Sequence, residues 1–455
     1  MGRLFGTDGV RGVANVPPLT PELTCRLGRI AAACLTEGRP PTRRRPALLI
    51  ARDTRVSGPL LEQALVAGVL SAGVDALVAG VLPTPAVAAL TPALGAAGGV
   101  VLSASHNPFE DNGIKLFSAE GDKLPDAWED ETETRLQSGW DGPRPTGAGL
   151  GRLRPVPGAE RRYLDGVRSS LPAGFTLAGW RIVLDCAHGA TYRVGPRLFR
   201  SLGAEVLTLG TRPNGVNINR AGGALHPAAL QARVRATPGA IGLALDGDGD
   251  RLIVVDESGA VRDGDHVLAV CARALLARGA LRGGVVVSTV MANLGLERAL
   301  SGLGLGMARV AVGDRYVLEE MRRLGANLGG EQSGHVIFLD HARTGDGLLT
   351  AVQLLRAVVE AGHPLSTLAG QVEKCPQVLV NVRVRTMPPL RELRRVAETL
   401  ARWEGTLDGR ARLLVRYSGT EALARVMVEG DEQTTIEAAA REIAAAIQEE
   451  IGAMA

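Results

Sequence analysis

Cysteine, lysine and aromatic residues are scarce in this chain of 455 residues, and the shortage of each type bears on which kinds of protein or core the chain can form. The five cysteines stand far apart without any CxxC pair, which argues against a disulfide framework or a zinc knuckle and favours a reducing compartment. Only three of the 51 basic residues are lysines, and the arginines are spread along the chain, so no basic stripe marks a nucleic-acid surface. Aromatic residues make up 3%, so leucine, valine and alanine must fill the core.

Long uninterrupted apolar runs are also missing. The longest stretch without Asp, Glu, Lys or Arg, residues 76–109, is broken by prolines and glycines, which is typical of buried strands rather than a bilayer span. Residues 2–15 are polar and glycine-rich, unlike a signal peptide. A formal net charge of +3 is too small to indicate a nucleic-acid or membrane partner. These features predict a cytoplasmic protein with no nucleic-acid partner and no membrane partner.

Short β-branched runs alternate with helical segments rich in alanine, leucine and arginine. This alternation predicts parallel or mixed sheets covered by helices. Helices are expected at residues 58–72 and 193–202. The expected strands are residues 47–51, 76–79, 99–103, 181–185, 204–209, 241–245, 252–255 and 285–289.

Composition marks two boundaries along the chain. Residues 139–158 are crowded with glycine and proline and are typical of a linker. After residues 373–376 the pattern changes to an α+β module, with strands at 377–385, 412–417 and 424–429 and helices at 390–403 and 434–451. The predicted fold class is α/β, with three similar mixed-sheet domains followed by an α+β domain. The four predicted domains are residues 1–155, 156–255, 256–372 and 373–455.

The run Asp246-Gly-Asp-Gly-Asp-Arg251 lies between two predicted strands and places three carboxylates close together. At ~4 Å and an effective dielectric constant near 20, each like-charged pair costs roughly 4 kcal/mol. A divalent cation removes that cost, and oxygen ligands select Mg²⁺, Ca²⁺ or Mn²⁺ over zinc. An EF-hand is rejected because Arg251 stands where the calcium loop needs glycine and the next residues are β. The alternative is a solvated acidic turn.

A second polar run, Ser103-Ala-Ser-His-Asn-Pro108, follows a predicted buried strand and precedes Asn112-Gly-Ile-Lys115. Ligands of α/β proteins bind at the carboxyl ends of such strands. No GxSxG elbow surrounds the serines, which argues against a serine-hydrolase triad. Ser105 is a candidate phosphate carrier, since a phosphoserine would supply an oxygen to the cation. The alternative role for Ser105 is a helix N-cap.

Two further runs offer groups for a phosphorylated, hydroxyl-rich ligand. Gly329-Gly-Glu-Gln-Ser-Gly-His335 presents a carboxylate, an amide, a hydroxyl and an imidazole, a set that suits a polyhydroxylated ligand. Arg416-Tyr-Ser-Gly-Thr420, with Arg425, combines guanidinium groups, hydroxyls and backbone N–H groups into a phosphate cradle. This second run lacks the GxxxxGK[ST] pattern of an ATP-type P-loop. The alternatives are a polar surface turn and solvated arginines.

Two arginine-bearing runs lie in loops beside predicted strands. They are Phe5-Gly-Thr-Asp-Gly-Val-Arg-Gly12 and Arg52-Asp-Thr-Arg55. Each either contributes positive charge to a site or forms only a tight turn with a structural salt bridge.

In this order and spacing, the polar runs resemble the α-D-phosphohexomutase superfamily over roughly residues 2–450, and most closely its phosphoglucosamine mutase family. Three features distinguish that family: the opening run, Ser103 where phosphomannomutases usually have threonine, and Gln332 where they usually have methionine. The resemblance implies four domains around a central active-site cleft, each contributing one loop. It also implies the interconversion of glucosamine 6-phosphate and glucosamine 1-phosphate, a step toward UDP-N-acetylglucosamine and peptidoglycan.

The same resemblance implies a role for each run. Ser105 would be the phosphoserine. One Mg²⁺ per subunit would be held by Ser105, Asp246, Asp248 and Asp250. Glu331 and Ser333 would bind sugar hydroxyls. The phosphate that is not reacting would be bound by Arg416, Ser418, Gly419, Thr420 and Arg425.

Phosphoryl transfer needs positioning and charge neutralisation more than covalent help. Mg²⁺, Arg11 and Arg251 are expected to neutralise the transferring group. A base must accept the proton of the sugar hydroxyl, and Lys115 is the first candidate and His335 the second. The first transfer would give glucosamine 1,6-bisphosphate, which must turn around in the cleft to recharge the serine. The C-terminal domain is expected to move as a lid.

Two other functions are compatible with parts of this sequence. A phosphomannomutase or phosphoglucomutase would share the chemistry but prefer a sugar without the 2-amino group. A catalytically silent phosphosugar-binding protein is disfavoured, because Ser105 and the aspartates are all present. The resemblance further suggests a homodimer formed through the first domain.

Overall fold

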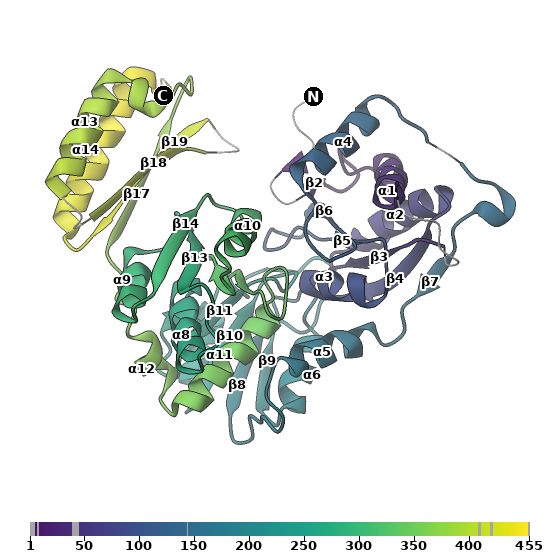
Figure 1. The fold of residues 1–455 in the computed structure, drawn as a ribbon, viewed down its shortest axis with the longest axis horizontal. Helices are drawn as coiled ribbons and strands as arrows, with labels where there is room; N and C mark the ends of the chain where they lie inside the picture. The colour runs from purple at the N-terminus through teal and green to yellow at the C-terminus, as the bar shows by residue number, and fades with distance from the viewer. Residues whose placement is uncertain are drawn as a thin grey trace. The chain divides into compact units, whose positions relative to one another are not determined.

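The computed structural model describes residues 5–6, 9–38, 45–142, 144–407, 411–418 and 422–453. These residues form four sheets with their covering helices (Figure 1). The chain divides into two compact units, one built from the residues up to Thr289 with Ala308–Gly370, the other from Val290–Met307 with the residues from Gln371 onward. The predicted class, mixed α/β sheets followed by a small α+β domain, is confirmed.

The first sheet has seven strands in the order β1-β2-β6-β5-β3-β4-β7. Its strands are β1 (Phe5–Gly6), β2 (Gly9–Val13), β3 (Ala47–Arg52), β4 (Asp75–Val81), β5 (Gly98–Leu102), β6 (Asp111–Phe117) and β7 (Leu153–Pro155). The accompanying helices are α1 (Pro21–Thr36), α2 (Gly58–Ser71), α3 (Thr84–Ala93) and α4 (Asp126–Gln137). Strands β3, β4, β5 and β7 run parallel, whereas β6 is antiparallel to β5 and returns the chain beside it.

The predicted linker at residues 139–158 is wrong in its last part. Leu153–Pro155 form β7, which pairs in parallel with Ala76–Val78 of β4, and a short 3₁₀ turn (Gly147–Gly149) precedes it. All three residues of this strand are exposed. A strand without a buried face has no alternation of apolar and polar residues by which the sequence could reveal it. A short edge strand of this kind is specified by backbone pairing alone.

The second sheet has the order β12-β11-β10-β8-β9. Its strands are β8 (Arg181–Asp185), β9 (Glu205–Leu209), β10 (Ala240–Leu245), β11 (Leu252–Val255) and β12 (Val261–Arg262). Its helices are α5 (Ala159–Ser169), α6 (Val194–Ser201) and α7 (Ala228–Arg235). Strands β10 and β11 are antiparallel neighbours, so the acidic run between them forms the turn of a hairpin.

The third sheet has the order β14-β13-β15-β16. Its strands are β13 (Val285–Thr289), β14 (Gly306–Val310), β15 (Leu328–Gly330) and β16 (Val336–Phe338). Along this stretch of the chain the helices are α8 (Gly264–Ala277), α9 (Leu294–Gly302), α10 (Asp314–Leu324), α11 (Gly347–Ala361) and α12 (Leu365–Ala369), of which α9 lies in the second compact unit. The polar loop at residues 331–335 joins β15 to its antiparallel neighbour β16.

The C-terminal sheet is antiparallel in the order β17-β19-β18, and its helices cover one face (Figure 1). Its elements are β17 (Gln377–Arg383), β18 (Ala411–Tyr417), β19 (Leu423–Gly430), α13 (Arg394–Leu407) and α14 (Gln433–Ile451). The helix expected at residues 390–403 begins later, at Arg394, because a 3₁₀ turn (Leu390–Glu392) follows Pro389. Apolar side chains of both helices and of the sheet form a core of their own, with Val396, Val426 and Ile443 fully buried.

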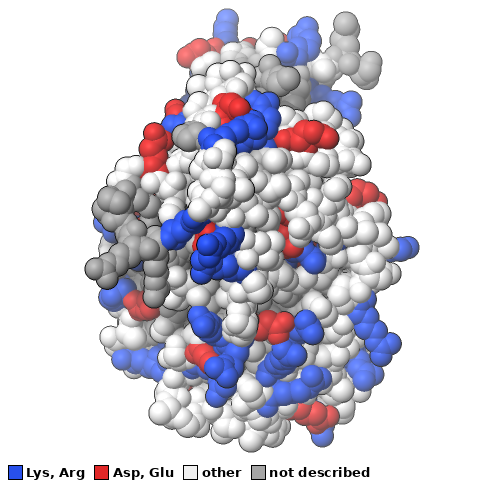
Figure 2. All heavy atoms as spheres, turned by 90° about the vertical axis from the view of Figure 1, so that its right-hand side faces the viewer, with Lys and Arg blue, Asp and Glu red and all other residues white. Residues whose placement is uncertain are grey.

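The basic side chains are scattered over the surface, as the arginines are scattered along the sequence. The face in Figure 2 carries acidic side chains among the basic ones. Within the described ranges, no helix combines the length and the apolar composition that crossing a membrane requires.

Helices α1 and α2 pack closely because each has a glycine against the backbone of the other. A Cβ atom on Gly28 would lie 2.4 Å from the carbonyl oxygen of Leu65, and one on Gly68 would lie 2.0 Å from that of Cys25. Real side chains do not approach a backbone so closely, so an added methyl group would push the helices apart.

We predict that Gly68→Ala lowers the stability of the first domain by about 1–3 kcal/mol. The matched control is Gly166→Ala in the exposed part of α5, where an added Cβ meets no atom within 4 Å. That control is expected to raise stability by roughly 0.5–1 kcal/mol, because alanine loses less chain entropy than glycine in a helix. Calorimetric unfolding midpoints of the two variants test this difference. Midpoints that shift equally would contradict the packing argument.

Candidate active site

The loop after β5 carries Ser105 into the interior of the protein. Ser105 is 2% exposed and has a left-handed backbone, with φ near 50°. Its Oγ donates a hydrogen bond to Asp246 Oδ2 at 2.6 Å. The serine run and the acidic run, 141 residues apart in sequence, therefore meet in space.

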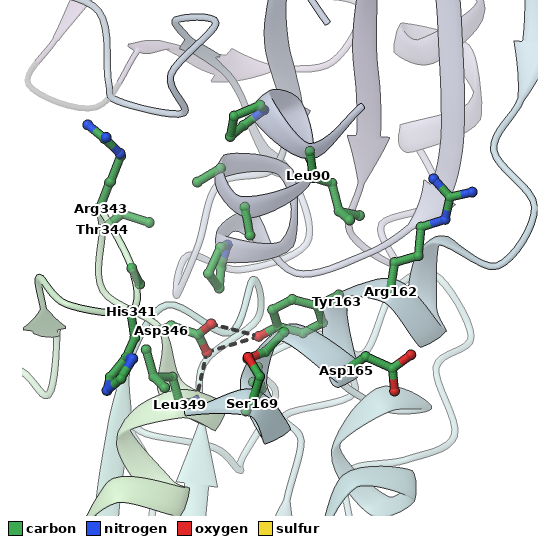
Figure 3. A pocket seen from close by; sticks show the side chains of 18 of the residues that line it. Leu90, Arg162, Tyr163, Asp165, Ser169, His341, Arg343, Thr344, Asp346 and Leu349 are labelled. Carbon is green, nitrogen blue, oxygen red and sulfur yellow. Dashed lines mark hydrogen bonds between the residues drawn. The ribbon is translucent and has the colours of Figure 1, made fainter. Parts of the chain in front are cut away.

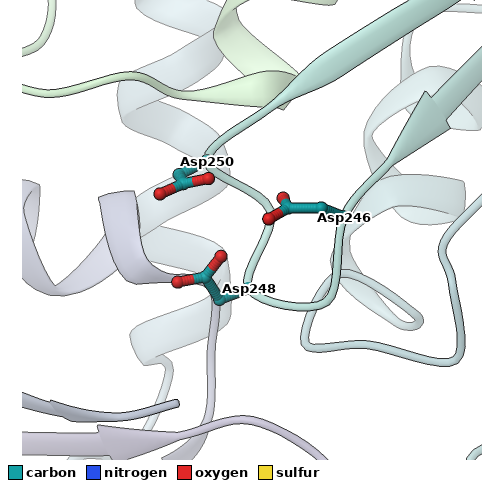
Figure 4. Close-up of side chains that lie close together, drawn as sticks. All are labelled: Asp246, Asp248 and Asp250. Carbon is teal, nitrogen blue, oxygen red and sulfur yellow. The ribbon is translucent and has the colours of Figure 1, made fainter. Parts of the chain in front are cut away.

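Three buried carboxylates gather at the β10–β11 turn (Figure 4). One oxygen each from Asp246, Asp248 and Asp250 can be chosen so that all three lie within 4.8 Å of one another. Asp248 Oδ1 and Asp250 Oδ1 are buried, and neither accepts a hydrogen bond from the described residues. Buried carboxylate oxygens are costly without a partner, so this set fits a hard divalent cation. Burial and the charges of Asp250 and Asp248 raise the pKa of Asp246 well above its usual range.

Lys115 on β6 supplies positive charge to the same cluster. Its side chain is 2% exposed, and Nζ lies 2.9 Å from Asp248 Oδ2 and 3.7 Å from Asp250 Oδ2. Thr84 Oγ1 also donates to Asp248 Oδ2, at 2.6 Å. Lys115 and Thr84 therefore both bond to Oδ2 of Asp248, and Oδ1 accepts no hydrogen bond from the described residues. Sequence reasoning missed Thr84, since nothing in its local sequence at the start of α3 marks it.

His335, at the start of β16, bridges two carboxylates. Nδ1 lies 3.6 Å from Asp250 Oδ2, and Nε2 lies 3.2 Å from Asp314 Oδ2. Burial alone would lower the pKa of His335, but Asp314 and Asp250 outweigh it and raise the pKa to about 10. The backbone N–H of Gly345 also lies 2.9 Å from Nε2, a contact that suits a neutral ring. Two full negative charges outweigh one amide dipole, so the ring is protonated and acts as a donor.

Burial opposes the charged form of Asp250, but Lys115 and His335 outweigh it and hold the pKa of this carboxyl well below its usual range. Arg251 contributes at the same place. Its backbone N–H donates to Asp246 Oδ1 at 3.2 Å, and its Nε lies 3.8 Å from Asp250 Oδ1. The acidic turn is therefore neutralised on several sides by cationic side chains.

His106, next to the serine, is a residue to which sequence reasoning gave no role. Its Nδ1 lies 3.4 Å from Ser105 Oγ. Burial, Arg251 and Arg11 lower the pKa of His106 to about 4, so the ring is neutral at neutral pH.

Arg11 lies on β2, where it pairs in register with Gly113 of β6. The charge of Arg11 acts on His106 in the serine loop.

The loop between β15 and β16 brings Glu331 and Ser333 together. Glu331 Oε1 accepts from the backbone N–H of Gly313 at 3.1 Å, and its Oε2 accepts from Ser333 Oγ at 3.3 Å. Gln332 Nε2 donates instead to Asp265 Oδ2 on α8, at 2.9 Å. The loop thus presents one carboxylate and one hydroxyl side by side, and Gln332 anchors it to the body of the domain.

In the C-terminal unit, Arg416 on β18 and Arg425 on β19 are cross-strand partners. Arg425 Nη2 donates to Ser418 Oγ at 3.3 Å. Burial and the neighbouring charge of Arg425 lower the pKa of Arg416. Two adjacent guanidinium groups beside a hydroxyl are a set of donors that suits an anion. Gly419 and Thr420, the other predicted members of this site, lie outside the described residues.

A cavity of about 680 Å³ lies between α3, α5 and the segment before α11 (Figure 3). Tyr163 Oη donates to both oxygens of Asp346 in its wall, at 2.9 and 3.0 Å. Burial raises the pKa of Asp346 to about 6. None of the predicted site residues lines this cavity, so its size does not mark the active site.

Comparison with known proteins gives the family. Four models match in order: phosphoglucomutase/phosphomannomutase alpha/beta/alpha domain I at residues 2–140, domain II at 161–259, domain III at 263–375 and the C-terminal domain at 379–446. A phosphoglucosamine mutase from Desulfovibrio desulfuricans is 49% identical over 450 residues, covering 99% of both chains. One from Sorangium cellulosum is 50% identical over 451 residues, covering 99% of this chain and 93% of that protein.

A solved structure supports the same assignment. The crystal structure of a phosphoglucomutase/phosphomannomutase family protein from Burkholderia thailandensis matches with a TM-score of 0.80 at 25% identity, covering 98% of this chain and 97% of its own. Both sequence and fold therefore agree along the whole chain. The protein belongs to the phosphoglucosamine mutase family of the α-D-phosphohexomutase superfamily.

Proposed function

We propose that the protein interconverts glucosamine 6-phosphate and glucosamine 1-phosphate through a phosphoserine at Ser105 and a glucosamine 1,6-bisphosphate intermediate. This reaction leads toward UDP-N-acetylglucosamine and peptidoglycan. The observation that carries the proposal is the 2.6 Å approach of Ser105 Oγ to Asp246 Oδ2 inside a buried acidic cluster. The names of relatives near 50% identity over the whole chain support the choice of sugar.

The proposed metal is one Mg²⁺, held by Asp246, Asp248, Asp250 and an oxygen on Ser105. The unbonded oxygens of Asp248 and Asp250 and the all-oxygen donor set support this choice. When bound, Mg²⁺ supplies positive charge that stabilises the oxygens of the phosphoryl group.

The proposed transfer is a displacement at phosphorus. The sugar hydroxyl oxygen attacks the phosphoryl group on Ser105, the bond from phosphorus to Oγ breaks, a base takes the hydroxyl proton, and the released Oγ takes up one proton to become the free serine hydroxyl. Arg11 and Arg251 neutralise the transferring group. Lys115 is the first candidate base and His335 the second; both lie beside carboxylates of the acidic turn, so either accepts the hydroxyl proton only in its neutral form. In the second half-reaction, Ser105 receives the other phosphate of the bisphosphate.

The remaining assignments follow the same proposal. Glu331 and Ser333 bind sugar hydroxyls, and the C-terminal domain binds the phosphate that is not reacting and moves as a lid. The residues proposed for that phosphate are Arg416, Ser418, Gly419, Thr420 and Arg425. The domain limits at residues 155, 255 and 372, a homodimer and a cytoplasmic location stay predictions.

The sugar preference is tested by comparing kcat/KM for glucosamine 6-phosphate, mannose 6-phosphate and glucose 6-phosphate. We expect glucosamine 6-phosphate to be preferred by at least about tenfold, since a site that pairs the 2-amino group loses a contact with the other sugars. A preference for mannose or glucose phosphates would instead support the alternative, a phosphomannomutase or phosphoglucomutase.

Ser105→Ala removes the proposed phosphate carrier. We expect kcat to fall by at least about 10³-fold, because alanine has no hydroxyl to carry the phosphoryl group. Ser118→Ala, which removes a hydroxyl bonded to Glu120 just after β6, is the control and should retain activity. Thermal midpoints near that of the wild type would show that both variants fold. Near-normal turnover by Ser105→Ala would rule out the phosphoserine route.

Asp248→Asn removes one charge from the proposed metal site. We expect the dissociation constant for Mg²⁺ to rise by at least about tenfold, as seen when groups around a metal are replaced. Titration calorimetry with MgCl₂ alone measures this without turnover. Asp130→Asn on the exposed side of α4 controls for net charge. Equal Mg²⁺ affinity in both variants would exclude Asp248 as a ligand.

A further inference from the structure

Two side chains from different domains donate hydrogen bonds to the same two carbonyl oxygens of the serine loop. Arg55, from the loop before α2, donates through Nη2 to Ser105 O at 3.2 Å and to Asn107 O at 3.0 Å. Asn219, from the segment between β9 and α7, donates through Nδ2 to Ser105 O at 2.8 Å and to Asn107 O at 2.9 Å. Arg55 also bonds to the carbonyl oxygen of Pro108.

The arginine is itself fixed in place. Its side chain is 1% exposed, and Nε donates to Asp53 Oδ2 at 2.8 Å. Ser103 Oγ donates to the same oxygen at 2.6 Å and accepts from the backbone N–H of Ser105 at 3.0 Å. The network therefore holds both the N–H and the C=O of Ser105. It also shows that the salt bridge expected within Arg52-Asp-Thr-Arg55 serves the serine loop.

This network stabilises an unusual backbone conformation at Ser105. Ser105 has φ near 50°, a left-handed conformation that serine rarely adopts and that persists only when its surroundings enforce it. The acidic turn packs directly on the network, because a Cβ on Gly247 would lie 2.5 Å from Ser105 O and 2.7 Å from Asn219 Nδ2. The carbonyl oxygen of Ser105 thus fixes the distance between the serine and the turn that carries Asp246.

We infer that Arg55 and Asn219 form a clamp that holds Ser105 in its left-handed conformation and aims Oγ at the acidic cluster. Both are positioning residues, since they bond to backbone carbonyl oxygens and act on the reaction through Ser105. The link from the clamp to turnover rests on the proposed function. The clamp itself rests on the distances and burial given above.

Asn219→Asp tests the clamp with a side chain of the same size. It replaces the donor with a carboxylate that repels the two carbonyl oxygens. We expect the single-turnover rate of phosphoryl transfer from glucose 1,6-bisphosphate to Ser105 to fall by about 10- to 100-fold, with the half-saturating concentration changed less than about threefold. A merely structural defect would alter binding and thermal stability as well.

Asn217→Asp is the matched control two residues away. Asn217 also bonds to backbone groups, donating to Arg212 O at 3.0 Å and accepting from Asn214 N at 2.9 Å, but outside the clamp. The transfer rate of Asn217→Asp should equal that of the wild type.

Arg55→Lys keeps the charge beside Asp53 and loses the planar fork, so it should slow transfer in the same way as Asn219→Asp.

Hydrogen exchange tests the clamp independently of the proposed function. Exchange of the amides at residues 103–107 should be faster in Asn219→Asp than in the wild type and in Asn217→Asp. Unchanged exchange would overturn the clamp, and faster exchange with an unchanged transfer rate would overturn its positioning role. If wild-type Ser105 accepts no phosphoryl group, the proposed function is wrong, and exchange alone still decides whether the clamp exists.

Discussion

Three buried carboxylates at one hairpin turn are the constraint on which the rest of this structure depends. Like charges at such short distances repel strongly, and burial removes the water that would screen them. The compensating cations come from different parts of the chain: Lys115 from the first sheet, Arg251 from the turn itself and His335 from the third sheet. Neutralising the trio therefore joins elements of three sheets within one compact unit.

The same constraint explains the conformation of the serine loop. The hydroxyl of Ser105 reaches a buried acidic turn from a neighbouring domain. Ser105 adopts a left-handed conformation there, and Gly247 lacks the side chain that would prevent the close approach. The cost of the strained loop is offset by a dense set of hydrogen bonds to its backbone. The serine loop is therefore held in place where the proposed chemistry needs a fixed distance between Ser105 and the acidic turn.

Much of this could be predicted from the sequence, for physical reasons that differ between elements. Buried parallel strands such as 181–185 and hairpin strands such as 252–255 match their predicted limits, because continuous β-branched runs mark them. The meeting of Ser105 with the acidic run followed from motif order and resemblance. The exposed edge strand β7 was mistaken for a linker, since pairing without burial leaves no pattern. Thr84 and Asn219 were missed because their contacts are distant in sequence. His106 was given no role although it stands inside the serine run, next to Ser105.

The central claim is that a phosphoryl group on Ser105 shares a cation with the acidic trio. Paramagnetic broadening of the phosphoserine ³¹P signal tests it most directly, with Mn²⁺ as a stand-in for Mg²⁺. After phosphorylation by a hexose 1,6-bisphosphate, one equivalent of Mn²⁺ should broaden that signal strongly, and Asp248→Asn should suppress the effect. A phosphoserine signal that stays sharp at stoichiometric Mn²⁺ would contradict the account.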